Sequence, residues 1–167
     1  MVVLDSSAVI PLITVGRIDL LQKNFPTVFV PAVVWKEVVE AGKNLGKNVH
    51  AFERGRDAWF VVHSSPDKKE VQTFMKALHL EEADAEVLLL AKQKNDILLT
   101  NDAALYACCM TENVVAWWLT TLLLASLKKK IISKQEAEAI LLELVHTANI
   151  RLSSDILAQL LLMMRNM

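Results

Sequence analysis

The stretch VVLDSS, residues 2–7, decides the fold, because three aliphatic residues run directly into an acid and two serines. Such a short apolar run is typical of a buried strand, and residues 6–16 then have a helical pattern that Ser6 or Ser7 can cap. We therefore expect Asp5 at the carboxyl end of a central strand. An ionised carboxylate there is costly to desolvate without a partner, so the sequence favours a functional role over a helix cap.

The rest of the chain repeats this alternation of strand and helix. Parallel strands joined by helices predict right-handed crossovers and a sheet covered on both faces, with ligands bound outside the carboxyl ends of the strands. The amphipathic segments after about residue 133, with Ser133 and Ser153 as caps, are expected to form an extension packed on a single domain that spans residues 1–167. Further strands are expected at residues 27–31, 58–64, 96–100 and 113–118, and the main helices between them at 32–42, 66–78, 81–95 and 101–110.

Three more acids follow at related positions. Asp102 comes two residues after Thr100 at the end of LLT, and Asp84 lies in the first turn of a predicted helix. Either acid can equally be a helix cap or a dipole partner. Glu37 lies one helical turn after Val33, so we expect its carboxylate on or beside the apolar stripe.

Together these acids indicate one pocket. Four carboxylates that converge raise each other's pKa values unless a cation holds them, which points to a hard metal ion and phosphate chemistry. The four histidines are scattered without ligand spacing, which argues against a zinc site.

The bulk composition sets further limits. A net charge of −1 gives no global basic field. Hydrophobic residues make up 53% of the chain, an excess that predicts a buried partner interface. The adjacent Cys108 and Cys109 are interpreted as two buried thiols of a reducing cytoplasm. The N-terminus has no signal-peptide pattern, and the longest apolar stretch, residues 114–127, is too short to cross a bilayer.

The ordered set of segments resembles the PIN-domain ribonucleases. The resemblance is carried by VVLDSSAVIPLITVGRIDLL, by VP followed by a helix with VWKEV, by DAEVLLLA and by LLTND. It is greatest to the VapC-type toxins of prokaryotic toxin–antitoxin pairs. The resemblance implies a three-layer α/β/α sandwich with a central parallel sheet of four to five strands. It also implies an endonuclease that cuts RNA with Mg²⁺ or Mn²⁺.

Site residues follow from the resemblance, position by position. The four acids of the family fall on Asp5, Glu37, Asp84 and Asp102, and supporting roles fall on Ser7 and Thr100, with Asn101 beside them. We expect Asp5 and Asp102 to bind the main ion directly. Asp84 would share that ion or hold a second one, and Glu37 would act through water.

Two departures from the family pattern matter. Many relatives have a Gly-Glu-Ala-Glu-like segment where this chain has EEADAE, which makes Glu82 an alternative to Asp84 as third acid. Where relatives often carry a Gly-Thr pair after the last strand, this chain has AWWLTT, residues 116–121. This second change affects the local backbone and substrate access without touching a predicted metal ligand.

The expected partners are an RNA substrate, a cognate antitoxin protein and a second copy of the chain in a homodimer, all in the cytoplasm. The alternatives are an RNA-processing nuclease unrelated to toxin–antitoxin systems and a non-catalytic PIN-like interaction protein. In the interaction protein the functional surface would be Trp117, Trp118, Leu122 to Leu124 and Leu160 to Met164.

A phosphotransferase of the haloacid-dehalogenase kind is disfavoured because Ser7 stands where that family needs its second aspartate. A receiver domain is disfavoured because no lysine follows the fifth predicted strand in the required manner. Candidate cations for RNA phosphates are Arg17, Lys36, Lys43, Lys47, Arg54 and Arg56.

Overall fold

The strands form one parallel sheet at the centre of the molecule. The structure is a computed structural model that describes residues 1–44 and 49–167. In this described part the sheet has five strands in the order β3-β2-β1-β4-β5. All of its pairings are parallel. The strands are β1 (Val2–Leu4), β2 (Val28–Pro31), β3 (Phe60–His63), β4 (Ile97–Leu99) and β5 (Ala116–Trp117).

Strand β1 occupies the middle of this sheet because its side chains are apolar on both faces. Val2, Val3 and Leu4 are completely buried, as parallel strands covered on both sides require. In register, Val3 pairs with Phe29 of β2 and with Leu98 of β4.

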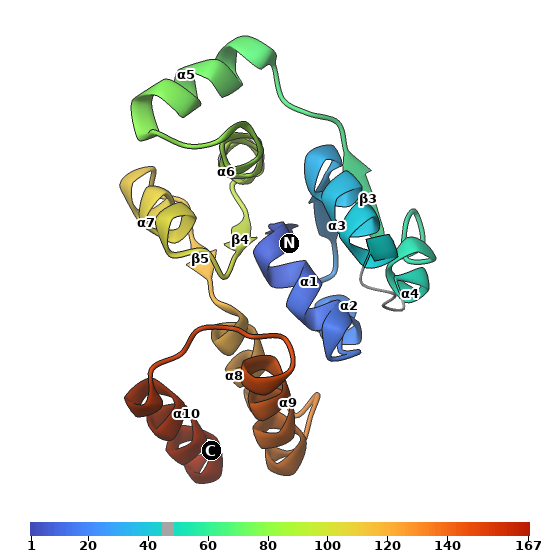
Figure 1. Ribbon diagram of the computed structural model, residues 1–167, viewed down its shortest axis with the longest axis vertical. Coiled ribbons are helices and arrows are strands. Elements are labelled where there is room, and N and C mark those ends of the chain that lie inside the picture. The colour runs from blue at the N-terminus through green and yellow to red at the C-terminus, as the bar shows by residue number, and fades with distance from the viewer. Residues whose placement is uncertain (45–48) are drawn as a thin grey trace.

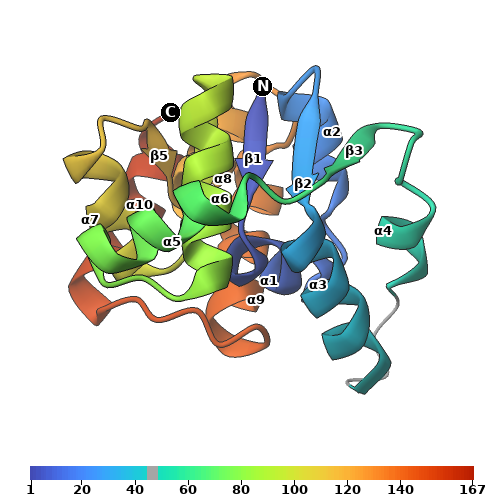
Figure 2. The same cartoon turned by 90° about the horizontal axis from the view of Figure 1, so that it is seen from above.

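Helices cover both faces of the sheet and make the predicted three layers (Figures 1 and 2). On one side lie α1 (Ser6–Thr14) and α2 (Asp19–Asn24), with α3 (Ala32–Asn44) packed beside α1 and the short α4 (His50–Glu53) following it. On the other side α6 (Glu82–Lys94) packs on β1 and β4, between α5 (Lys68–Leu78) and α7 (Ala103–Thr111). The predicted α/β class and the sandwich architecture are confirmed.

The last three helices attach to α2. They are α8 (Leu119–Lys128), α9 (Lys134–His146) and α10 (Ser154–Asn166), and α8 packs against α2 while α9 and α10 pack on α8. The side chains of Ser133 and Ser153 accept hydrogen bonds at the N-termini of α9 and α10, so both predicted caps are confirmed.

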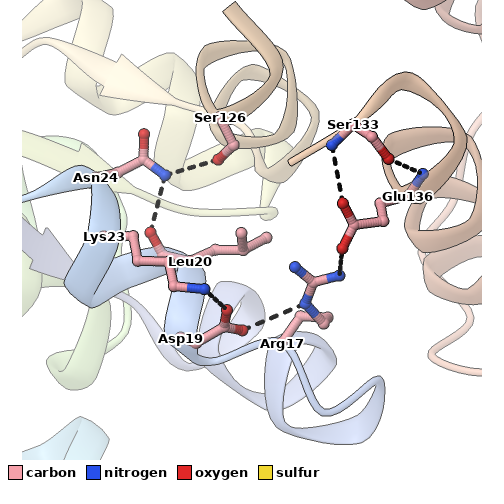
Figure 3. Close-up of polar contacts among 8 residues, drawn as sticks. All are labelled: Arg17, Asp19, Leu20, Lys23, Asn24, Ser126, Ser133 and Glu136. Carbon is pink, nitrogen blue, oxygen red and sulfur yellow. Dashed lines mark hydrogen bonds and ion pairs between the residues drawn. The ribbon is translucent and has the colours of Figure 1, made fainter. Parts of the chain in front are cut away.

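A polar network fixes this attachment (Figure 3). The buried Asn24 amide donates to the Leu20 carbonyl at 2.9 Å and to Ser126 Oγ of α8 at 2.6 Å. Arg17 reaches Glu136 at the start of α9, with Nη1 and Oε1 4.0 Å apart, and also pairs with Asp19. Because an unpaired buried amide is costly, the Asn24 contact specifies how α8 sits on α2.

Two expectations, one about an apolar surface and one about a helix cap, are corrected by the structure. Leu122, Leu123, Leu160 and Met164 are buried in the core, so they do not belong to an exposed apolar surface. The exposed apolar residues of the C-terminal helices are Leu142, Ile156, Leu162 and Met163. The residue at the N-cap of α1 is Asp5, and its side chain makes no capping bond, so neither Ser6 nor Ser7 is the cap.

Within the part of the chain that the structure describes, no helix is long and apolar enough to cross a membrane.

Candidate active site

The predicted acids meet where the strand order reverses. Chain segments leaving β1 and β4 diverge toward opposite faces of the sheet, α1 to one side and α7 to the other (Figure 1). Parallel α/β sheets bind ligands at this kind of topological switch point. Asp5 follows β1 and Thr100 follows β4, and the Asp5 amide donates to the Leu99 carbonyl at 3.0 Å.

Asp5 is held by two hydroxyl groups. Both Ser7 Oγ and Thr100 Oγ1 donate to Asp5 Oδ2, the latter at 2.8 Å. The side chain of Asp5 is buried, and this burial raises its pKa, while the bonds from Ser7, Thr100 and nearby backbone groups lower it. The two hydroxyl donors therefore partly compensate the cost of a buried carboxylate and fix its orientation.

The same hydroxyl groups order the turn after β4. Thr100 Oγ1 accepts a hydrogen bond from the Asp102 amide at 3.0 Å, and Ser7 Oγ accepts one from the Asn101 amide at 2.8 Å. Asp102 Oδ1 in turn caps α7 by accepting from the Leu105 amide at 2.8 Å. Asp102 is thus both a cap and a member of the acid cluster. The two interpretations that the sequence left open for it are compatible.

The charges of the other three predicted acids act on Asp84. Its pKa is raised to about 6, first by burial and then by the negative charges of Asp5, Asp102, Glu81 and Glu37. Asp84 is half-buried in the first turn of α6, which crosses above β1 and β4. Glu82, the alternative third acid, is exposed in the same turn.

Glu37 takes part from the rim of the site. We expected its carboxylate on or beside the packed stripe of its helix, but the side chain is exposed. Val34 and Val38, one turn apart, face the core at 1% exposure each, and Glu37 is rotated by about 100° from Val38. Its charge still contributes to the raised pKa of Asp84.

The donor set suits a hard divalent cation. It consists of carboxylate and hydroxyl oxygens, which Mg²⁺ and Mn²⁺ prefer, and burial followed by neighbouring negative charges raises the pKa of Asp84. Among residues 1–44 and 49–167, no three His, Cys, Asp or Glu side chains already stand close enough to hold one ion together. Mg²⁺ is often bound by only one or two carboxylates with waters and substrate phosphate, so this open arrangement fits it. Asp5, Asp84 and Asp102 are the residues that would hold the ion.

Two cysteines border the cluster as free thiols. Cys109 is completely buried, and burial with the negative charges of Cys108 and Asp5 raises its pKa to about 12. Burial, Asp84 and Asp102 raise the pKa of the half-buried Cys108. Both thiols therefore stay protonated at neutral pH and are poor nucleophiles.

The cations proposed for RNA contacts are only partly available. Arg17 is occupied by Asp19 and Glu136, and Arg56 lies over the ring of Trp35 at 5.4 Å. Lys47 and the side chain of Lys43 lie outside the residues that the structure describes.

A cavity of about 810 Å³ opens directly beside the acids. Ser7, Asn101 and Asp102 line it together with Trp118, which follows β5, and with the connection between α9 and α10. Sequence reasoning did not find this cavity. The end-of-strand position of Trp118 was the available signal, because it is the same kind of position that marked Asp5 and Asp102.

Comparison with known proteins identifies the family. A family model described as PIN domain matches residues 1–165, nearly the whole chain. The chain belongs to the PIN domain family. PIN domains are generally nucleases, they typically use a divalent metal, and the family suggests an RNA substrate.

One solved structure supports the fold of this PIN domain, and a second is more weakly similar. PAE2754 from Pyrobaculum aerophilum is similar, with 22% identity, a TM-score of 0.58, and coverage of 75% of this chain and 96% of that one. A PilT N-terminus domain protein, SSO1118 from Sulfolobus solfataricus P2, is 16% identical with a TM-score of 0.49, covering 76% of this chain and 93% of its own. No curated protein matches the chain.

Proposed function

We propose that this PIN domain is a Mg²⁺- or Mn²⁺-dependent endoribonuclease that acts in the cytoplasm, with Asp5, Asp84 and Asp102 as metal ligands. The observation that carries the proposal is the geometry at the switch point, where Asp5 and Asp102 follow the neighbouring strands β1 and β4 and Thr100 Oγ1 links the Asp5 carboxylate to the Asp102 amide. Burial and the nearby carboxylates, Asp5 and Asp102 among them, raise the pKa of Asp84 on α6, which supports a shared site. A bound ion would lower this repulsion, activate a water and stabilise the charge that develops on the phosphate.

The protein groups have distinct roles in this proposal. Ser7 and Thr100 hold the Asp5 carboxylate in one orientation, which is the kind of second layer that tunes a metal ligand. Capping of α7 orients Asp102. Glu37, whose side chain is exposed, would act through a water molecule.

Cleavage of a labelled single-stranded RNA tests the proposal. The wild type is compared with Asp5→Asn and Asp84→Asn in Mg²⁺ and in Mn²⁺, with EDTA as a further control. We expect each variant to lose cleavage by at least about 100-fold, since each removes a metal ligand. Equal rates in the three proteins, or no cleavage of varied RNAs with either ion, would refute the nuclease proposal.

Glu82→Gln is the matched control for the third acid. Glu82 lies in the same first turn of α6 as Asp84, but it is exposed. It should keep most of the activity that Asp84→Asn loses. If Glu82→Gln is the inactive variant instead, the third ligand is Glu82.

We further propose that the enzyme is the toxin of a toxin–antitoxin pair and forms a homodimer. Support comes from the exposed Ile156, Leu162 and Met163 on α10, which give an apolar surface for a second copy or for an antitoxin helix. Growth arrest on induction, relieved by a small protein encoded beside this gene, would support the toxin assignment. Unimpaired growth with full RNase activity would favour RNA processing. Light scattering of the purified protein, compared with Leu162→Glu, measures the dimer.

A further inference from the structure

The cavity beside the acids has the character of a ligand site. Its volume of about 810 Å³ lies in the usual range for small-ligand pockets. Asn101, Asp102 and Ser7 form its end nearest to the acid cluster, and the side chains farther away are mainly apolar, including Ile10 and Pro11 of α1. A molecule bound at the acids can therefore continue into the cavity without leaving the protein surface.

An aromatic pair makes one wall of this cavity. Trp118 stacks on Tyr106 of α7, with ring centroids 4.3 Å apart and an angle of 14° between the planes. Tyr106 supports the indole from behind, and Trp118 is the member of the pair that lines the cavity. A half-buried indole fixed in this way is a preorganised stacking platform.

A second part of the lining carries an amide and a guanidinium among apolar residues, and it is anchored to the fold. It is formed by residues 148–152 between α9 and α10. Ile150 is buried at 6% exposure, and its amide donates to the Leu144 carbonyl at 3.0 Å. This anchor presents Asn149 and the exposed Arg151 at the cavity. An amide beside a guanidinium suits a base edge beside a phosphate better than it suits an apolar protein helix.

We propose that this cavity is a base-binding subsite for RNA, which rests on the function proposed above. One nucleobase adjacent to the scissile phosphate stacks on Trp118, and Arg151 contacts a flanking phosphate. Unpaired bases stack on aromatic side chains in this way in single-strand recognition, so the substrate class is single-stranded RNA. The AWWLTT segment that departs from the family pattern thereby selects the nucleotide next to the cut.

Binding measurements with abasic oligonucleotides test the subsite. A fluorescein-labelled octaribonucleotide is titrated in Mg²⁺ with protein carrying Asp84→Asn, which prevents cutting and leaves the cavity wall intact. The probe series carries one abasic site at each position in turn. Trp118→Leu should raise Kd about 5- to 100-fold. An abasic site at one position should raise Kd for the Trp118 protein similarly, and the two losses should not add.

Matched variants separate the subsite from general effects. Trp59→Leu, a tryptophan beside the far edge strand β3, should leave Kd unchanged. Arg151→Gln should weaken all probes alike and reduce the salt slope of log K by about 0.7. Ala103→Phe fills the cavity from an exposed helix position and should reproduce the loss, which decides the question if Trp118→Leu does not fold.

Several results would overturn the proposal. Unchanged Kd in both Trp118→Leu and Ala103→Phe would do so, as would a full abasic effect that persists in Trp118→Leu. Unchanged RNA affinity with loss of the homodimer would assign the cavity to a protein partner and reject the base. If the wild type cuts RNA but the losses from Trp118→Leu and from the abasic site add, only the subsite proposal fails. If these two losses do not add and no RNA is cut, the nuclease proposal fails and the RNA-binding site stands.

Discussion

Replacing Asp84 by asparagine is expected to stabilise the metal-free protein while removing its activity. The pKa of Asp84 is raised from 3.8 to about 6 in the folded protein, by burial and by neighbouring carboxylates. Below pH 3.8 the group is protonated in both the folded and the unfolded states and contributes nothing to the pH dependence. Between pH 3.8 and 6 the unfolded chain loses the proton first, so the free energy of unfolding falls as pH rises. Above pH 6 the full penalty persists.

The size of the effect follows from this shift. Two pKa units correspond to about 3 kcal/mol, which solvent screening of a half-buried group reduces to about 1–2 kcal/mol. For a domain of this length that is a rise in Tm of about 2–8 °C for Asp84→Asn at pH 8. The gain should shrink toward zero near pH 4, because there the aspartate is protonated in the folded state and close to half protonated in the unfolded state.

Thermal unfolding in EDTA at pH 4 and pH 8 measures the effect. Glu82→Gln is the control for the lost charge at the N-terminus of α6, since both acids lie in its first turn. Addition of Mg²⁺ should stabilise the wild type more than Asp84→Asn, because the ion binds the intact cluster more tightly. An Asp84→Asn protein with an equal or lower Tm than wild type at pH 8 in EDTA would show that burial and the neighbouring carboxylates do not destabilise the ionised Asp84.

Two further predictions concern groups around the cluster. Thr100→Val removes the hydroxyl that donates to Asp5 and accepts from the Asp102 amide, so it should cost about 1–3 kcal/mol of unfolding free energy and weaken Mg²⁺ binding. Thr100→Ser should restore both properties. Denaturant unfolding measures the first and metal titration the second. In the native protein at pH 8, Cys109 should resist thiol reagents and Cys108 should react slowly, because their pKa values are raised. Both thiols should react at once in denaturant. Rapid labelling of native Cys109 would contradict its burial and raised pKa.

The elements of the fold were predictable because their signals are local. Strands such as VVL are short, apolar and followed at once by polar residues, and the crossover rule then determines parallel pairing. The carboxyl ends of parallel strands share one edge of the sheet, so the positions of Asp5 and Asp102 after two strands predict that both lie there. Serine caps at Ser133 and Ser153 were equally local and were confirmed.

What the sequence did not reveal depends on contacts between distant segments. The exposure of the Glu37 side chain could not be predicted, because a shift of one residue along a helix turns a side chain from the core to solvent. The neighbouring helix decides which side of the helix is covered. Leu122 and Leu123 were placed on a surface because nothing local shows that α8 packs on α2. The Asn24–Ser126 bond that fixes this packing joins residues 102 positions apart.

These distant contacts also relate the C-terminal helices to the proposed chemistry. The acids belong to the sheet and its adjoining helices, but the cavity beside them is closed by residues 148–152 of the extension. That wall keeps its place only while α8 stays on α2 and α9 on α8, through the buried amide of Asn24 and the anchoring of Ile150. The family resemblance therefore accounts for the acids, whereas the selectivity of the site is expected to depend on segments that the acid motifs do not include. In this PIN domain the extension would complete the substrate site as well as stabilise the fold.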